Sequence, residues 1–122
     1  MPIRILIVDD DPVFRDRITA ALRQQGYDVV GTAHSIAEAR ASVTDLEPDA
    51  LLLDVNLPDG DGIAFAFEVV AAGRAPQILL TSTDPAAAPA GLVRRSGAAG
   101  FIPKVDLAAT DLGPLLGSSR RA

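Results

Sequence analysis

Two short runs of consecutive apolar residues, each followed at once by a carboxylate, constrain the fold of this chain more than any other feature. One run is residues 5–8 (ILIV), which leads into Asp9, and the other is residues 51–53 (LLL), which leads into Asp54. A strand with one face in water alternates apolar and polar residues, whereas a strand covered on both faces is apolar throughout. The two runs therefore predict buried strands of a parallel sheet.

Further apolar segments alternate with helix-like stretches along the chain. The expected strands span residues 3–8, 28–33, 50–53, 77–81 and 99–102. The expected helices span about residues 12–25, 36–46, 62–72, 85–96 and 107–116. Strands and helices that alternate with short connections predict an α/β protein with a doubly wound parallel sheet.

Several helix boundaries are marked by the local sequence. Asp11 followed by Pro12 is an N-cap with a proline at the first helical position. The stretch SIAE at residues 35–38 is typical of a capping box. Pro85 and Pro89 are expected to shorten or loosen the fourth helix, because a proline inside a helix costs about 3 kcal/mol.

The composition fits one domain and excludes several classes of protein. The chain has 122 residues, 48% of them hydrophobic, so residues 1–117 are expected to form one domain, followed by a disordered tail or the start of a linker at residues 118–122. The absence of cysteine excludes a disulfide framework and a thiolate metal site. A net charge of −5 without a basic stripe predicts no direct binding of nucleic acid. No apolar run approaches the roughly 20 residues of a membrane span, so no membrane insertion and a cytoplasmic location are expected.

Polar side chains follow the expected strands at the edge where a doubly wound sheet carries its site. Asp9 and Asp10 follow the first strand, Asp54 follows the third, and a hydroxyl-bearing stretch at residues 81–83 (TST) ends the fourth. Lys104 follows the fifth strand. Oxygen ligands without histidine or cysteine suit a hard cation, and Mg²⁺ typically takes one or two carboxylates. The sequence therefore predicts a magnesium site among the acids.

Lys104 is the single lysine among the eleven Lys and Arg residues of the chain. Its compact ammonium group enters a tight pocket between anionic groups more easily than a planar guanidinium does. Its place after the fifth strand is therefore consistent with a role at the acidic site.

The four strand-end motifs, taken in order, resemble the receiver domain of bacterial two-component response regulators. The motifs are VDDDP at residues 8–12, LLLDVNLPDGDG at residues 51–62, LLTST at residues 79–83 and GAAGFIPK at residues 97–104. The resemblance covers nearly the whole chain. It implies a flavodoxin-like (βα)5 fold of five parallel strands in the order 2-1-3-4-5.

The resemblance also implies roles for individual residues. Asp54 is similar to the aspartate that accepts a phosphoryl group from a partner kinase's phosphohistidine. Asp9 and Asp10 are similar to the acidic pair that holds Mg²⁺ together with Asp54, with Asp10 the more direct ligand. Asn56 would add its backbone carbonyl to the metal, and Mn²⁺ is a possible substitute. Lys104 would pair with a phosphoryl oxygen.

The hydroxyl of the fourth strand is ambiguous by one residue. The family spacing, counted back from Lys104, favours Ser82 as the group that binds the phosphoryl oxygen and leaves Thr81 as the alternative. Thr83 would then take the adjacent small-residue position and bind through its backbone. Phe101 falls where the family places an aromatic residue that changes rotamer on activation.

The resemblance implies a signalling domain and not an enzyme that turns over a separate substrate. Its expected partner is a sensor histidine kinase, and the expected response is a change in the surface formed by the fourth helix, fifth strand and fifth helix. That surface would form a homodimer or dock another protein. Val105 follows Lys104 where many receivers have proline, a variant often found in receivers attached to DNA-binding domains, so control of transcription is a possible output.

Two other functions remain open from the sequence. Haloacid dehalogenase phosphatases also use an aspartate, Mg²⁺ and a lysine, but they usually have a second acid two residues after the nucleophile, where this chain has Asn56. A pseudo-receiver would keep the fold and lose the chemistry, and Mg²⁺ binding would separate it from an active receiver. The acids Asp59 and Asp61 lack the remaining ligand spacing of an EF-hand, and are interpreted as part of a solvated turn.

Overall fold

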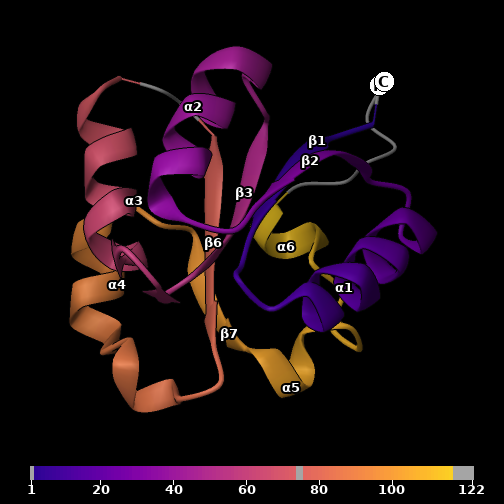
Figure 1. Cartoon of the computed structure of the whole chain (residues 1–122). Helices are drawn as coiled ribbons and strands as arrows, with labels where there is room; N and C mark the ends of the chain where they lie inside the picture. The colour runs from indigo at the N-terminus through magenta and orange to yellow at the C-terminus, as the bar shows by residue number, and fades with distance from the viewer. Residues whose placement is uncertain (1, 74–75, 117–122) are drawn as a thin grey trace.

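A five-stranded parallel sheet forms the central layer of the computed structural model, which describes residues 2–73 and 76–116 (Figure 1). Its strands are β1 (Arg4–Val8), β2 (Asp28–Ala33), β3 (Ala50–Asp54), β6 (Gln77–Ser82) and β7 (Gly100–Pro103). They lie in the order β2-β1-β3-β6-β7, and each pair of neighbours is parallel. This arrangement confirms the predicted 2-1-3-4-5 order of a flavodoxin-like fold.

Helices cover both faces of the sheet. They are α1 (Pro12–Gln24), α2 (Ile36–Leu46), α3 (Gly62–Ala71), α4 (Ala90–Ser96), α5 (Lys104–Leu107) and α6 (Gly113–Leu116). In Figure 1, α2, α3 and α4 lie on one side of the sheet, and α1, α5 and α6 lie on the other. The two buried apolar clusters follow the same division, and we call them the α3-side core and the α1-side core.

The strand β1 shows why the apolar runs are uninterrupted. Leu6 and Val8 belong to the α3-side core, whereas Ile5 and Ile7 belong to the α1-side core. All four side chains are at most 1% exposed. Successive residues of a strand point to opposite faces, so an apolar side chain is needed at every position when both faces are covered. Burial of each such side chain contributes about 1.5–3 kcal/mol.

The predicted cap of α1 is confirmed, and that of α2 is half correct. Asp11 Oδ1 accepts hydrogen bonds from the backbone N–H groups of Val13 at 3.0 Å and Phe14 at 3.4 Å. At the start of α2, Ser35 Oγ accepts from the Glu38 N–H at 3.1 Å. The return bond of the capping box goes elsewhere, because Glu38 Oε1 accepts from the N–H of His34, at 2.9 Å.

The fourth helix is short, as its prolines predict. A 3₁₀ turn, η1 (Pro85–Ala87), precedes α4, which begins only after Pro89. The N–H groups of Leu92 and Val93 both donate to the Pro89 carbonyl at 3.0 Å. Pro89 therefore starts the helix and does not interrupt it, consistent with its lack of an N–H group.

The prediction of one last helix over residues 107–116 is wrong. The chain forms two separate helices of four residues each, α5 and α6. Between them, Asp111 Oδ1 accepts a hydrogen bond from the Gly113 N–H at 2.9 Å, which closes a local turn. Leu112, at the turn, is fully buried in the α1-side core. The buried leucines of this segment therefore keep the spacing of one helix, although the backbone between α5 and α6 is not helical.

The prediction that Asp59 and Asp61 belong to a solvated turn is confirmed, since both acids are exposed and Asp59 lies in a turn, but the turn is part of a larger element with its own contacts. The strands β4 (Asn56–Leu57) and β5 (Gly60–Asp61) pair in a small antiparallel hairpin. At its tip, Asp59 accepts hydrogen bonds from the N–H groups of Ile36 at 2.8 Å and Ala37 at 3.0 Å, so it caps α2 from outside the helix. Asp61 caps α3 by accepting from the Ile63 N–H at 2.8 Å.

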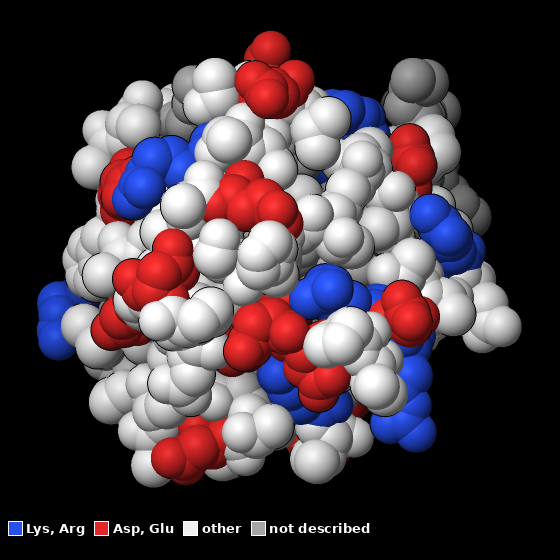
Figure 2. Space-filling view, in the orientation of Figure 1, with Lys and Arg blue, Asp and Glu red and all other residues white. Residues whose placement is uncertain are grey.

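The remaining sequence predictions concern membrane insertion, surface charge and the end of the chain. No helix within residues 2–73 and 76–116 combines the length and the apolar character needed to cross a membrane. On the face seen in Figure 2, acidic and basic side chains are interspersed. The predicted tail or linker at residues 118–122 lies outside the described residues.

Candidate functional site

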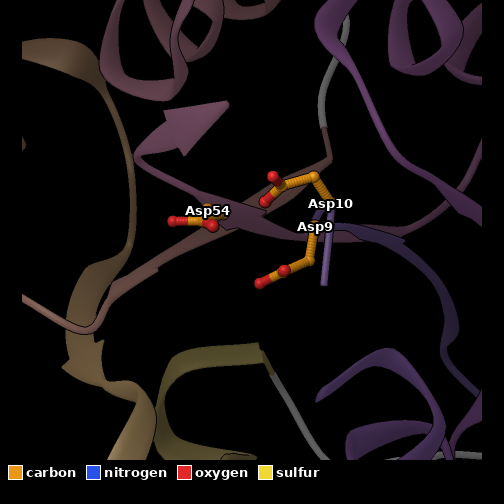
Figure 3. A group of neighbouring side chains, drawn as sticks. All are labelled: Asp9, Asp10 and Asp54. Carbon is orange, nitrogen blue, oxygen red and sulfur yellow. The ribbon is translucent and has the colours of Figure 1, made fainter. Parts of the chain in front are cut away.

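Three carboxylates from two adjacent strands meet at one edge of the sheet. Asp9 and Asp10 directly follow β1, and Asp54 is the last residue of β3, which pairs with β1 in parallel. One oxygen of each carboxylate lies within 4.8 Å of the others. Figure 3 shows the three side chains projecting from these strand ends toward a common region. The structure thus brings together the acids that the sequence predicts at the site.

The three acids differ in exposure and in their hydrogen bonds. Asp9 and Asp54 are only 1% and 4% exposed, whereas Asp10 is exposed. Asp9 Oδ1 accepts a hydrogen bond from the Asp11 N–H at 2.9 Å, and Asp54 Oδ1 accepts from the Asn56 N–H at 3.1 Å. One oxygen of each buried carboxylate is therefore fixed by the backbone, and the second oxygen of each faces Lys104.

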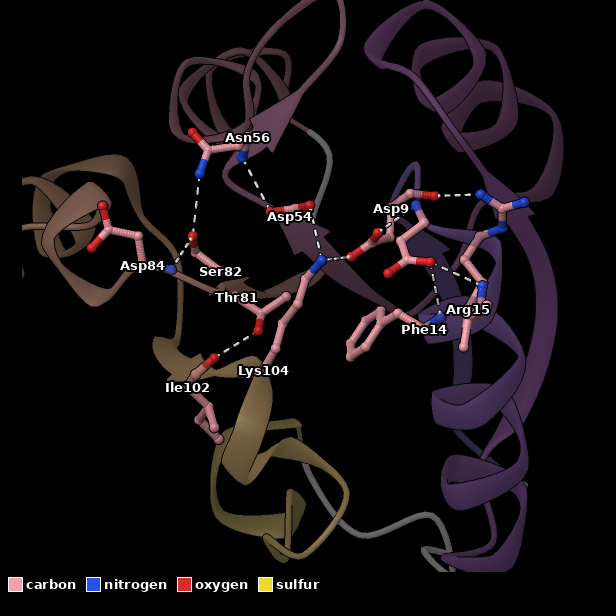
Figure 4. Close-up of polar contacts among 12 residues, drawn as sticks. Asp9, Phe14, Arg15, Asp54, Asn56, Thr81, Ser82, Asp84, Ile102 and Lys104 are labelled. Atoms are coloured by element: carbon pink, nitrogen blue, oxygen red, sulfur yellow. Dashed lines mark hydrogen bonds and ion pairs between the residues drawn. The ribbon is translucent and has the colours of Figure 1, made fainter.

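Lys104 brings the positive charge to the site. Its Nζ lies 2.7 Å from Asp9 Oδ2 and 3.2 Å from Asp54 Oδ2 (Figure 4). The residue directly follows β7, two strands away from β3 in the sheet order, and opens α5. Its side chain is 12% exposed. The strand-end position predicted for the lysine is confirmed.

Negative charge exceeds positive charge in this cluster. Two unit charges about 5 Å apart repel by about 3–4 kcal/mol at an effective dielectric constant of about 20. The pKa of the Asp54 carboxyl is raised above its ordinary value, mainly by burial and further by the charge of Asp9. The hydrogen bond from the Asn56 N–H and the charge of Lys104 lower the pKa, but they do not cancel the increase. The ionised form of Asp54 is therefore held at a cost in free energy that an additional cation would reduce.

The pKa of Lys104 reflects the same imbalance of charge. Burial by itself lowers the pKa of the ammonium group, but the hydrogen bond to Asp9 and the charges of Asp54 and Asp9 outweigh this effect and raise the pKa overall. The lysine therefore stays protonated and acts as a fixed positive charge between two strands.

The residues present fit a divalent cation with a preference for oxygen. Apart from the ion pair with Lys104, the buried Oδ2 of Asp9 has no hydrogen-bond partner within the described ranges. Three carboxylates with an exposed member, Asp10, leave an approach from solvent. Mg²⁺ binds through one or two carboxylates and keeps several water ligands, which suits a cluster that is open on one side.

The two hydroxyl groups at the end of β6 point to different partners. Thr81 Oγ1 donates to the Ile102 carbonyl at 2.7 Å, and so fastens β6 to β7. Ser82 Oγ accepts from Asn56 Nδ2 at 3.2 Å and from the Asp84 N–H at 3.0 Å. Ser82 therefore faces the segment that follows Asp54, whereas Thr81 is committed to the neighbouring strand. Thr83 is exposed beside them, and its predicted backbone role rests on position alone.

The chain matches the family model described as the response regulator receiver domain over residues 5–111. The match includes both acidic strand ends, the hydroxyl-bearing strand end and the lysine. The chain belongs to the response regulator receiver domain family. The resemblance expected from the motifs is confirmed, and the receiver domain is a signalling domain.

Curated relatives of this receiver include an enzyme and a transcriptional regulatory protein. It is 38% identical over 111 residues to protein-glutamate methylesterase/protein-glutamine glutaminase 1 of Xanthomonas campestris pv. campestris, a match that covers 88% of the receiver and 31% of that protein. It is 32% identical over 117 residues to the transcriptional regulatory protein PdtaR of Mycobacterium tuberculosis, covering 88% of the receiver and 57% of that protein. The chain thus spans about a third of the length of the methylesterase relative.

Solved structures show the same architecture. The signal receiver domain of the response regulator NarL from Mycobacterium tuberculosis aligns with a TM-score of 0.76 and 31% identity, over 90% of the receiver and 98% of that chain. The response regulator domain of CheB from Thermotoga maritima aligns with a TM-score of 0.77 and 27% identity, over 93% of the receiver and 86% of that chain.

Phe101 lies in β7 of the receiver, three residues before Lys104. Its side chain is half-buried and packs against the α3-side core. The residue thus lies on the strand that ends at Lys104 and that contacts α4. Its predicted role as a switch stays a prediction, as do the metal-binding role of the Asn56 carbonyl and the phosphoryl-binding role of Ser82.

Sequence reasoning missed three contacts around the acidic cluster. The ring of Phe14 lies under Lys104 Nζ, 4.6 Å from its centroid. Arg15 Nη1 donates to the Asp9 carbonyl at 2.7 Å, and the Asn56 side chain donates to Ser82. Phe14 and Arg15 lie in the first turn of α1, which starts at the same sheet edge as the acids. This position could have indicated from the sequence that the two residues lie near the site.

Proposed function

We propose that this receiver accepts a phosphoryl group on Asp54 from the phosphohistidine of a sensor histidine kinase, with the help of Mg²⁺, and passes the signal on through its surface. The observation that carries the proposal is the convergence of three carboxylates and the single lysine of the chain from three separate strand ends. A structural role alone gives no reason to gather buried acids beside one lysine, because the repulsion between them destabilises the fold.

The transfer is a nucleophilic displacement at phosphorus. Oδ2 of Asp54, the oxygen not held by the Asn56 N–H, forms the new O–P bond. The P–N bond of the phosphohistidine breaks, and the imidazole of the kinase leaves with the electron pair and takes up a proton. Such reactions depend on positioning and charge compensation more than on covalent chemistry by the protein.

Asp9, Asp10 and Asp54 would hold the magnesium ion, with the Asn56 carbonyl as a further ligand, and Mn²⁺ is a possible substitute. A divalent ion bound there supplies positive charge to the oxygens of the transferred group. The same charge offsets the repulsion among the three carboxylates, which is the reason these acids are tolerated together.

Ser82, Thr83 and Lys104 would receive the phosphoryl oxygens. Lys104 Nζ is already 3.2 Å from the oxygen of Asp54 that would carry the phosphorus. Ser82 Oγ would turn from its resting bond with Asn56 to donate to a phosphoryl oxygen, and the Thr83 N–H would donate to another. The orientation of Ser82 toward the Asp54 segment supports it over Thr81, whose hydroxyl is bound to β7.

The movement of Ser82 would couple the site to the surface of the second half of the domain. A shift of the segment after β6 opens space that the half-buried Phe101 ring can enter. The surface of α4, β7 and α5 then changes shape. In physical terms, a local electrostatic event shifts an equilibrium between two existing conformations.

The output would be homodimerisation or docking to another protein through that surface. Control of transcription through an attached DNA-binding domain is one form of this output, and the similarity to a transcriptional regulatory protein supports it. The similarity to a methylesterase over part of that protein's length supports control of an enzymatic domain as a second form.

The test is uptake of phosphate from a small phosphodonor with Mg²⁺, followed by intact-protein mass spectrometry. The parent receiver is expected to gain one phosphoryl group, and Asp54→Asn is expected to gain none. Asp45→Asn is the matched control, since Asp45 is an exposed aspartate on α2. Equal uptake by the parent and Asp54→Asn would exclude Asp54 as the acceptor. No uptake by the parent, in a protein that still binds Mg²⁺, would indicate a receiver that has lost the chemistry.

A further inference from the structure

The ammonium group of Lys104 is enclosed from two sides by groups of different kinds. On one side are the carboxylates of Asp9 and Asp54, at 2.7 Å and 3.2 Å. On another lies the ring of Phe14, whose centroid is 4.6 Å from Nζ (Figure 4). Phe14 is in the first turn of α1, is half-buried, and packs against the α1-side core. The ring is therefore held in place by the core as well as by the lysine.

We propose that Phe14 is a positioning residue for Lys104, which holds the ammonium group against the acceptor carboxylate by presenting the face of its ring. This inference rests on the proposed function of Asp54 as phosphoryl acceptor. It assigns to α1, which carries no acceptor, metal ligand or phosphoryl-binding group, a part in the reaction.

The physical reason for an aromatic residue is the nature of the lysine side chain. Lysine has a flexible stem and a strongly hydrated charge, and holding it in one rotamer costs conformational entropy. The face of an aromatic ring attracts a cation within about 6 Å of its centroid and at the same time excludes water from that side. A leucine in the same place would fill much of the space but would leave the ammonium group without this attraction.

The arrangement also fits the number of donors on the ammonium group. An ammonium group has three N–H donors, and Asp9 and Asp54 account for two ion pairs. The Phe14 ring covers the ammonium group without offering an oxygen acceptor that would compete for the third N–H. That N–H is available to an oxygen of the arriving phosphoryl group.

The first arm of the test uses the fact that Lys104 is the only lysine of the chain. Growth with ¹³C-labelled lysine gives NMR signals from this side chain alone. The ring face is expected to shift the terminal methylene protons of Lys104 upfield in the parent, and Phe14→Leu is expected to abolish the shift. Phe14→Tyr keeps the ring and should keep the shift. Methylene signals at their ordinary position in the parent would overturn the proposal.

The second arm measures the rate of phosphate uptake from a small phosphodonor with saturating Mg²⁺. Phe14→Leu is expected to slow uptake roughly two- to fivefold, in line with the strength of one cation–π contact, and Phe14→Tyr is expected to restore the parent rate. Val13→Ala is the matched control, because Val13 is the neighbouring residue of α1 and its side chain is 64% exposed.

The outcomes separate this proposal from the proposed function. If the parent is phosphorylated and Phe14→Leu loses the upfield shift but keeps the parent rate, the ring touches the lysine without positioning it, and the proposal is overturned while Asp54 remains the acceptor. If Phe14→Leu and Val13→Ala slow uptake equally, the effect is one of helix α1 and not of the ring, which also overturns it. If the parent takes up no phosphate, the proposed function fails, and so does the positioning role that rests on it.

Discussion

The two halves of this receiver differ in how their helices are built. The helices of the first half, α1, α2 and α3, have 13, 11 and 10 residues, and each begins with an aspartate or serine that accepts a backbone hydrogen bond. In the second half, α4, α5 and α6 have only 7, 4 and 4 residues, and α4 and α5 lack a side-chain cap. Short helices depend on tertiary packing for their stability more than long ones do.

Both halves contribute residues to the site, and the residues from each half would have different roles. Asp9, Asp10 and Asp54 come from the strands of the first half, whereas Ser82 and Lys104 come from the second. The acids that would hold a metal and accept the phosphoryl group thus stand on the more regular framework. The groups that would respond to the phosphoryl group stand beside short helices, which can shift at a lower cost in packing.

The largest effect is expected where the first half is packed most tightly behind the site. A Cβ at Gly62 would overlap the backbone oxygen of Asp54, so Gly62→Ala forces α3 away from the end of β3. We expect a loss of about 3 kcal/mol or more in the free energy of unfolding, measured by urea denaturation.

The matched control for this substitution is Gly60→Ala. Its Cβ would meet only the end of the Ile36 side chain, 2.8 Å away, which can move. A loss of about 1 kcal/mol or less is expected. Equal losses in the two variants would contradict the view that the close approach of α3 to Asp54 fixes this part of the site.

The second comparison removes one leucine from each half. Leu53→Ala deletes a side chain of β3 that is fully buried in the α3-side core, and we expect a loss of about 3 kcal/mol. Leu115→Ala deletes a half-buried side chain of α6, for which about 1 kcal/mol is expected. Urea denaturation measures both, and a larger loss in Leu115→Ala would reverse the ranking of the two halves.

The third prediction concerns the stability that is lost because Asp54 is ionised in a buried site. Because burial raises the pKa of Asp54, the fold favours its protonated form, and the stability from that form is lost as the pH rises through the raised pKa. Asn resembles the protonated form, so Asp54→Asn is expected to be more stable than the parent by about 1 kcal/mol at pH 7 in EDTA. The gain should shrink as the pH falls through the raised pKa and should be lost below the ordinary value of 3.8.

Added Mg²⁺ is the control for this prediction. A cation that binds the folded parent stabilises it, and Asp54→Asn, with one carboxylate fewer, should gain less. Thermal unfolding with and without Mg²⁺ measures the difference. A parent that is already the more stable protein in EDTA at pH 7 would contradict the assignment of net repulsion to the site.

The smallest effect is expected at the β4–β5 hairpin, which joins β3 to α3 and whose Asp59 caps α2. Asp59 accepts two backbone hydrogen bonds at the start of α2, and these bonds lower the pKa of its carboxyl. Asp59→Ala is expected to lower the midpoint of thermal unfolding by about 3 °C at pH 7. The difference should disappear as the pH falls through the lowered pKa, because a protonated carboxyl accepts these bonds weakly. A difference that persists in acid would exclude the carboxylate as the cause.

The strands and the residues at their ends could be predicted from the sequence, for a physical reason. Residues 5–8 and 51–53 are apolar at every position because both faces of the sheet are covered, and this pattern is local. Once the strands are known to be parallel, Asp9 and Asp54 must lie at one edge, and the structure places them there. The roles assigned to Ser82 and Phe101 came from the family resemblance and remain predictions.

The remaining features depend on contacts that no local pattern encodes. The break between α5 and α6 arises from the turn at Asp111, while Leu112 and Leu116 keep the apolar spacing of a continuous helix. The capping of α2 by Asp59 joins residues more than twenty positions apart in the chain. The contact of Phe14 with Lys104 joins α1 to the start of α5, and the sequence gives only the hydrophobic character of the phenylalanine.

Metal-dependent transfer to Asp54 is tested most directly by locating the phosphate after treatment with a small phosphodonor, by mass spectrometry of peptides from protein kept in Mg²⁺ or in EDTA. We expect one phosphoryl group on the peptide that contains Asp54, at Asp54 itself, with little uptake in EDTA. Phosphate on a different residue, or equal uptake at Asp54 in EDTA, would contradict it.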